Sequence, residues 1–169
     1  MLLIKRVPKE RGQPPLLRSA IRTAKQIHGD LNLLIAADKA AWASRRRFGH
    51  RRYLLAVYQL NWRWEESDDP ARLIRRAAAL DGRRLRRKQH PLRALIDLTT
   101  SEPNLKIRSR WERALRFVLT RKVPPKKLLA FLREHGGVSG CARFAAYVVP
   151  DPQRQLPESM LTDWFAMNR

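Results

Sequence analysis

Cysteine is nearly absent from this 169-residue sequence, and long apolar runs are missing altogether. The single cysteine, Cys141, excludes an intramolecular disulfide framework and a multi-cysteine zinc site. No stretch approaches the roughly 20 apolar residues that cross a bilayer. The apolar opening at residues 1–4 is too short for the core of a signal peptide. We therefore expect a cytoplasmic protein with no place in a membrane.

Acidic residues are also scarce, because 15 Asp and Glu stand against 36 Lys and Arg. The resulting net charge of +21 concentrates polyanions around the surface and speeds their association. Hydrophobic residues make up 44% of the chain, which separates it from charged disordered tails, since it can bury a core. Composition thus predicts a folded protein whose partner is a polyanion, with nucleic acid the first candidate.

Glycine is rare too, and the eleven prolines fall between long stretches rich in Ala, Leu and Arg. No segment alternates with the period of a strand, so we expect an all-α fold, a compact domain of about seven to eight helices. The expected helices cover residues 14–28, 31–48, 51–66, 70–80, 91–100, 104–122, 126–135 and 139–149. Gly29 would end the first and Asp30 would cap the second. We divide the chain into a flexible basic arm (1–13), an N-terminal helical core (14–82), a basic helical region (83–149) and a linker with a terminal helix (150–169).

The expected helix 31–48 is apolar on nearly every side, which places it at the centre of the core. Asp38 lies within its apolar face and would need a cationic or hydrogen-bonding partner. Core packing is also the better interpretation for Trp42, Trp64 and Trp111, because each falls on an apolar stripe.

The expected helix 104–122 has two faces of opposite character. One face is apolar and should pack on the core: Ile107, Trp111, Ala114, Leu115 and Val118. The opposite face is basic: Lys106, Arg110, Arg113, Arg116 and Arg121. Phe117 falls in the middle of this basic face, where it would stack on a base or enter a groove. The alternative is a solvated helix face that carries one exposed aromatic residue without a binding role.

Two short helices joined at Gly136 and Gly137 give the C-terminal part a shape like a helix-turn-helix. The second helix would begin near Ser139 and present Arg143 to bases. Neither register puts a small residue four positions before the turn glycine, because those positions hold Leu132 and Arg133. A plain helical hairpin therefore stays open as the alternative.

Three further clusters of basic residues are candidates for phosphate contacts. They are Arg45, Arg46, Arg47, Arg51 and Arg52; Arg83, Arg84, Arg86, Arg87 and Lys88; and Lys126 with Lys127. The first cluster also suits the end of a helix, where the dipole favours cations. The second could equally be a solvated linker.

Catalytic and metal-binding patterns are missing. The four histidines are far apart, no glycine-rich phosphate loop is present, and His135 with Cys141 lacks an orienting third residue. We therefore expect no enzymatic activity, no cofactor and no metal.

These observations predict a nucleic-acid-binding protein, with DNA favoured over RNA. Transcriptional regulation or DNA handling on a chromosome, plasmid or phage would suit it, as would a place in a bacterial nucleoid. The alternatives are an RNA-binding protein, a basic protein that docks on an acidic protein surface, and a protein of the membrane surface.

Overall fold

The computed structural model describes residues 24–44, 49–67, 69–86 and 89–148, and it confirms the all-α fold within these residues. The helices are α1 (Ala24–Ala43), α2 (His50–Ser67), α3 (Pro70–Leu80), α4 (Pro91–Thr99), α5 (Leu105–Thr120), the short 3-10 helix η1 (Pro125–Lys127), α6 (Leu128–Glu134) and α7 (Gly137–Val148). The expected basic arm, the terminal helix and five of the candidate arginines and lysines lie outside the described residues: Arg45, Arg46, Arg47, Arg87 and Lys88.

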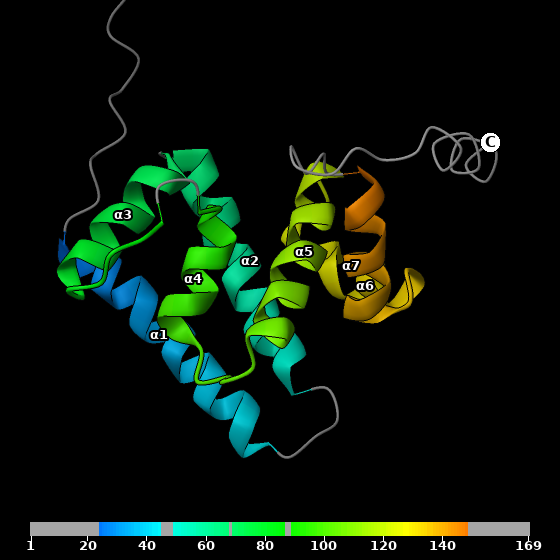
Figure 1. Cartoon of the computed structure of the whole chain (residues 1–169), viewed down its shortest axis with the longest axis horizontal. Helices are drawn as coiled ribbons and strands as arrows, with labels where there is room; N and C mark the ends of the chain where they lie inside the picture. Colours follow the sequence, from blue (N-terminus) through cyan, green and yellow to red (C-terminus); the bar gives the residue numbers. More distant parts are fainter. Residues whose placement is uncertain (1–23, 45–48, 68, 87–88, 149–169) are drawn as a thin grey trace, which may run out of the picture.

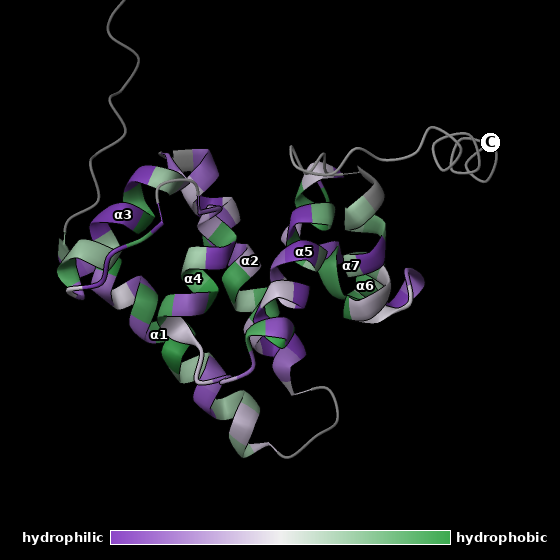
Figure 2. Cartoon of the chain, viewed as in Figure 1, coloured by the Kyte–Doolittle hydropathy of each residue, from purple (hydrophilic) through white to green (hydrophobic). Residues whose placement is uncertain are grey.

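The helices form two groups that share α5 as their border (Figure 1). On one side α1 and α2 run in opposite directions, and α3 and α4 pack against them; on the other side α6 and α7 lie beside α5. Buried apolar residues from Ile27 in α1 to Ala145 in α7 make a single core cluster. Hydrophobic and hydrophilic positions alternate along the helices (Figure 2), as expected for helices that bury one side. Because α5 contacts both groups, it must carry apolar residues on more than one side.

The predicted break between the first two helices is wrong, because α1 runs unbroken through Gly29 and Asp30. The Asp30 carboxylate caps nothing. It is buried and accepts hydrogen bonds from Nε1 of Trp64, at 3.0 Å, and from the Arg63 guanidinium, at 2.9 Å. Glycine costs a helix interior about 1 kcal/mol, and the burial of α1 against α2 offsets that cost.

The expected central position of residues 31–48 is also wrong, since α1 buries one side only. Leu31 and Leu34 are buried, but Leu33 is 66% exposed. Trp42 is 44% exposed, and its ring lies edge-on to the His50 ring at the start of α2. Trp64 and Trp111, by contrast, are buried as expected.

Local sequence signals set the starts of three helices that frame the site described below. Asp69, His90 and Asn104 each accept a hydrogen bond from the backbone N–H two residues on, and a proline follows Asp69 and His90 directly. These N-caps satisfy backbone donors that a helix start leaves unpaired.

The connection from α4 to α5 is fixed by a buried carboxylate. Asp38 accepts hydrogen bonds from the Thr100 hydroxyl and from both the backbone N–H and the hydroxyl of Ser101. The partner expected for Asp38 is therefore a pair of hydroxyls and an amide, which hold the start of α5 against α1.

Candidate nucleic-acid interface

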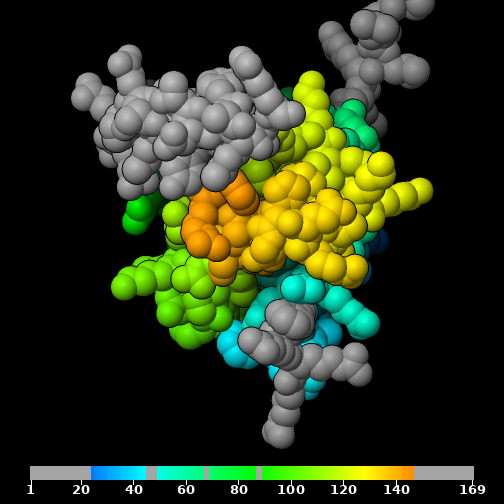
Figure 3. Space-filling model, turned by 90° about the vertical axis from the view of Figure 1, so that its right-hand side faces the viewer, coloured from blue at the N-terminus to red at the C-terminus, as the bar shows by residue number. Residues whose placement is uncertain are grey.

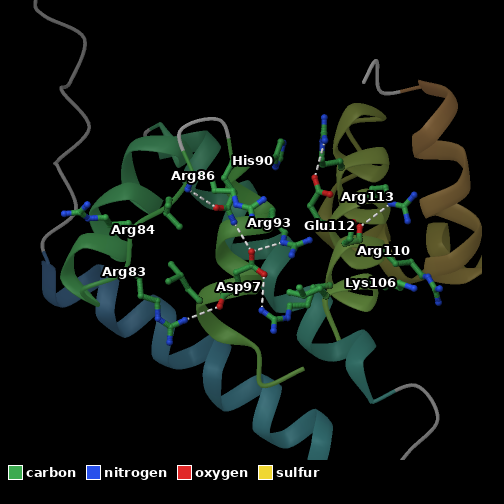
Figure 4. Close-up of a pocket in the computed structure, with 17 residues that line it drawn as sticks. Arg83, Arg84, Arg86, His90, Arg93, Asp97, Lys106, Arg110, Glu112 and Arg113 are labelled. Atoms are coloured by element: carbon green, nitrogen blue, oxygen red, sulfur yellow. Dashed lines mark hydrogen bonds and ion pairs between the residues drawn. The ribbon is translucent and has the colours of Figure 1, made fainter. Parts of the chain in front are cut away.

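A groove of about 1060 Å³ lies between the α3–α4 connection and α5 (Figure 4). Residues 83–86 and 89–98 form its first wall, and residues 105–116 of α5 form its second wall. Among the described residues, eight arginines and one lysine line it: Arg83, Arg84, Arg86, Arg93, Arg108, Arg110, Arg113, Arg116 and Lys106. Two carboxylates, Asp97 and Glu112, oppose them. We call this feature the basic groove. Its cations far outnumber its two carboxylates, so the groove carries a strong net positive charge.

Asp97 is the point at which the two walls of the basic groove meet. Its carboxylate accepts hydrogen bonds from Gln89, at 2.9 Å, from Nε of Arg93, at 2.7 Å, and from Arg108, at 3.3 Å. Its backbone carbonyl accepts one from Arg83, at 3.2 Å. One aspartate thus ties together the α3–α4 connection, α4 and α5, and it holds three arginines in fixed positions (Figure 4).

A second ion pair lies farther along α5, where Glu112 contacts the Arg116 guanidinium at 3.3 Å. Burial raises the pKa of the Glu112 carboxyl, although Arg116 acts in the opposite direction. Burial lowers the pKa of nearby His90 to about 4, with a smaller contribution from Arg116. The neutral His90 ring accepts the Leu92 N–H through Nδ1, so its lone pair is part of the helix cap.

Five cations of the basic groove have no carboxylate partner among the described residues: Arg84, Arg86, Lys106, Arg110 and Arg113. All five are exposed. Like charges held this close repel one another, so a bound polyanion would relieve an electrostatic cost. The basic groove can therefore hold phosphate groups without breaking an existing ion pair.

The structure brings together seven residues that the sequence analysis selected from two separate clusters: Arg83, Arg84, Arg86, Lys106, Arg110, Arg113 and Arg116. It adds Arg93 and Arg108, which the sequence analysis missed. Arg93 could have been found from its position four residues before Asp97, a spacing that pairs side chains on a helix. Arg108 also lies four residues before an acid, Glu112, but that spacing does not predict its true partner, since Arg108 pairs with Asp97 on another helix.

Phe117 corrects the interpretation of α5 most clearly, because it is only 2% exposed. Its ring stacks on Phe144 of α7 at 5.7 Å and contacts Phe131 of α6 at 5.8 Å. The sequence analysis gave α5 one buried face, but α7 covers a second one. Phe117 therefore cannot reach a base. Arg121, expected beside it on a binding face, lies over its ring, 5.5 Å from the centroid, and outside the basic groove.

The expected recognition helix begins earlier than predicted, because α7 starts at Gly137 and not near Ser139. α7 packs along α5, and Cys141, Ala142 and Ala145 are buried there. Ser139 and Arg143 are exposed, and Arg143 is the one basic residue in α7. Figure 3 shows α6 and α7 as the outer surface of this end of the molecule.

The remaining candidates are dispersed over other surfaces. Arg51 lines a second cavity, of about 470 Å³, together with Ser139, while Arg52 is exposed on α2. Lys126 and Lys127 are exposed in η1. None of these residues lines the basic groove.

Chemistry at Cys141 is disfavoured by its surroundings. The thiol is fully buried, and burial raises its pKa to about 11, so little thiolate forms at neutral pH. Within the described part of the chain, no group of three His, Cys, Asp or Glu could hold a metal ion, and no helix is long and apolar enough to span a membrane.

Comparisons of the chain with protein-family models, with curated proteins and with solved structures found no match. We therefore infer the function from the fold and from the charges of the basic groove.

Proposed function

We propose that the protein binds nucleic acid through the basic groove. The observation that carries this proposal is the convergence of nine cations from two separate segments, against two carboxylates, in one concave surface. A cationic face kept for solubility would be spread over the molecule and interspersed with acids. Gathering charge on both sides of a cleft instead focuses the field on a bound polyanion.

Phosphate contacts would supply the affinity. Each neutralised phosphate releases counterions, so the logarithm of the association constant falls linearly with the logarithm of the salt concentration. With the five unpaired cations engaged, we expect a slope of about −3.5 for a single strand and about −4.5 for a duplex. Fluorescence anisotropy with a labelled oligonucleotide, repeated across a salt series, measures this slope. A flat response would overturn the proposal.

Transcriptional regulation or DNA handling stays a prediction within this proposal. It depended in part on α7 as a reading helix, and with Cys141, Ala142 and Ala145 buried, Arg143 is the one exposed cation that α7 offers, beside Ser139 and Phe144. The ratio of absorbance at 260 and 280 nm of the protein purified from cells, before and after DNase or RNase, identifies the class of partner. A tight complex that survives both nucleases would favour an acidic protein partner.

A further inference from the structure

We infer that the basic groove holds one unpaired polynucleotide strand between its two walls, in preference to a duplex. This inference rests on the proposed function and narrows its ligand to single-stranded DNA or RNA.

The first argument is that cations line both sides of the basic groove. Arg84 and Arg86 belong to the α3–α4 connection, whereas Lys106, Arg110 and Arg113 belong to α5. An unpaired strand is accessible to protein from two sides. In a duplex, bases and the complementary strand cover the inner side of each backbone, so facing walls could not both reach it.

The second argument is the size and shape of the basic groove. Its volume of about 1060 Å³ is comparable with pockets that enclose most of a small molecule, which measure roughly 300–1,000 Å³. A space of this size accommodates a few nucleotides lying within it. Proteins that read duplex DNA instead project a helix or a ribbon into a groove of the nucleic acid.

The third argument concerns what else lines the basic groove. Leu105 is 63% exposed and Leu85 is half-buried, so both offer apolar surface to unstacked bases, which a duplex would keep paired. None of the described residues that line the basic groove is a Trp, Tyr or Phe. Base stacking on aromatic rings, the usual source of affinity besides charge, is thus small here. Binding should depend on the backbone and tolerate many sequences.

Arg108 supplies a fixed donor inside the basic groove. Its Nε is buried and has no hydrogen-bond acceptor among the described residues, while another nitrogen of the same guanidinium is held by Asp97. A buried N–H without an acceptor is unfavourable, because it has lost its hydrogen bond to water. Because this Nε is closed to solvent, a phosphate oxygen of a strand in the basic groove would satisfy it only after the guanidinium turns toward the strand.

The first experiment compares ligands with the full chain. Labelled oligo-dT and oligo-U of about 12 nucleotides, and a duplex of the same length, are titrated at one salt concentration. We expect both single strands to bind at least about fivefold more tightly than the duplex. A duplex that binds equally or more tightly overturns the inference but leaves the proposed function standing. Absence of binding to all three overturns the proposed function itself. Because oligo-dT and oligo-U differ in the 2′-hydroxyl and in the methyl group of the base, equal affinity for the two shows that neither group matters.

The second experiment tests the two walls separately. We expect the double variants R84Q/R86Q and R110Q/R113Q each to lower single-strand affinity about tenfold, and each to reduce the salt slope by about 1.4. The variant K126Q/K127Q removes the same charge from exposed lysines of η1 and should change affinity less than about threefold. Circular dichroism verifies that all three variants fold. If only R110Q/R113Q loses affinity, the ligand lies against α5 alone and the inference is wrong.

Discussion

The basic groove and the α6–α7 hairpin were both candidates for binding nucleic acid, and the structure gives them different characters. Nine cations from the α3–α4 connection, α4 and α5 converge on the basic groove. The hairpin, formed by α6 and α7, exposes Arg133 and Arg143, and its inner side is an aromatic cluster around Phe117. In one region polar side chains converge on a cavity, and in the other apolar side chains converge on each other.

This difference shows what distinguishes a binding surface from a packing surface in a highly basic chain. Both regions contain arginine, and α5 forms one wall of the basic groove and packs against the hairpin. In the basic groove, many exposed cations of separate elements face a shared space, with Asp97 and Glu112 holding some of them in place. Substitutions in the basic groove should therefore change binding more than stability, and substitutions inside the hairpin the reverse.

The largest effect should come from Phe117→Ala. Removing a buried phenylalanine leaves a cavity, so we expect the free energy of unfolding to fall by about 3–5 kcal/mol. Urea denaturation followed by circular dichroism measures this loss. A variant with unchanged stability but weakened binding would return Phe117 to the role of a base-stacking residue and break the comparison.

The next effect should come from charge removal in the basic groove. The triple variant R86Q/R110Q/R113Q should bind nucleic acid roughly 30-fold more weakly, because each lost phosphate contact at an exposed site is worth about 0.7 kcal/mol. Its stability should change little, since none of the three is paired with a carboxylate among the described residues.

The matched control for that triple variant is K126Q/K127Q/R143Q, which removes three charges from η1 and the hairpin. Anisotropy titrations of both variants at one salt concentration separate a local effect from a general one. Equal losses in the two triple variants would mean that net charge, and not the basic groove, determines affinity.

A smaller effect concerns the pH dependence of stability at His90. Its folded pKa of about 4 lies below the usual 6.5, so the unfolded chain takes up a proton first as the pH falls. The contribution of His90 is complete above pH 6.5 and decreases between pH 6.5 and 4. We expect a loss of about 1–2 kcal/mol, after allowance for the partial exposure of the ring.

The variant His90→Asn isolates this contribution, because asparagine also caps a helix but does not titrate in this range. Chemical denaturation at pH 7 and pH 4.5 should show a smaller loss of stability for the variant than for the parent protein. Parallel losses in the two proteins would contradict the assignment, since carboxyl groups titrate in both.

The smallest effect should come from Arg143→Gln, the substitution that tests α7 as a reading helix. We expect affinity to change less than about twofold and sequence preference not to change. Binding to a randomised pool of oligonucleotides, sequenced after selection, measures the preference. A shifted preference would restore a recognition role to the hairpin.

Much of the fold could be predicted because helix signals are local. The two-faced pattern of residues 104–122, the prolines between the helix-forming stretches and the missing strand period predicted α5 and the all-α class. The break at Gly29 was predicted wrongly, since contacts of α1 with α2 outweigh the low helix propensity of a glycine.

The sequence by itself determined the helical architecture, the excess of 21 positive charges, and the apolar face of α5 that carries Trp111 and Leu115. Only the tertiary structure decided that residues 83–86 face α5 across a groove, that Asp97 joins the two walls, and that Phe117 is buried under α7. The physical reason is one of range. Helix periodicity and capping depend on residues within a turn or two of each other, whereas the meeting of distant cations depends on which helix faces pack together.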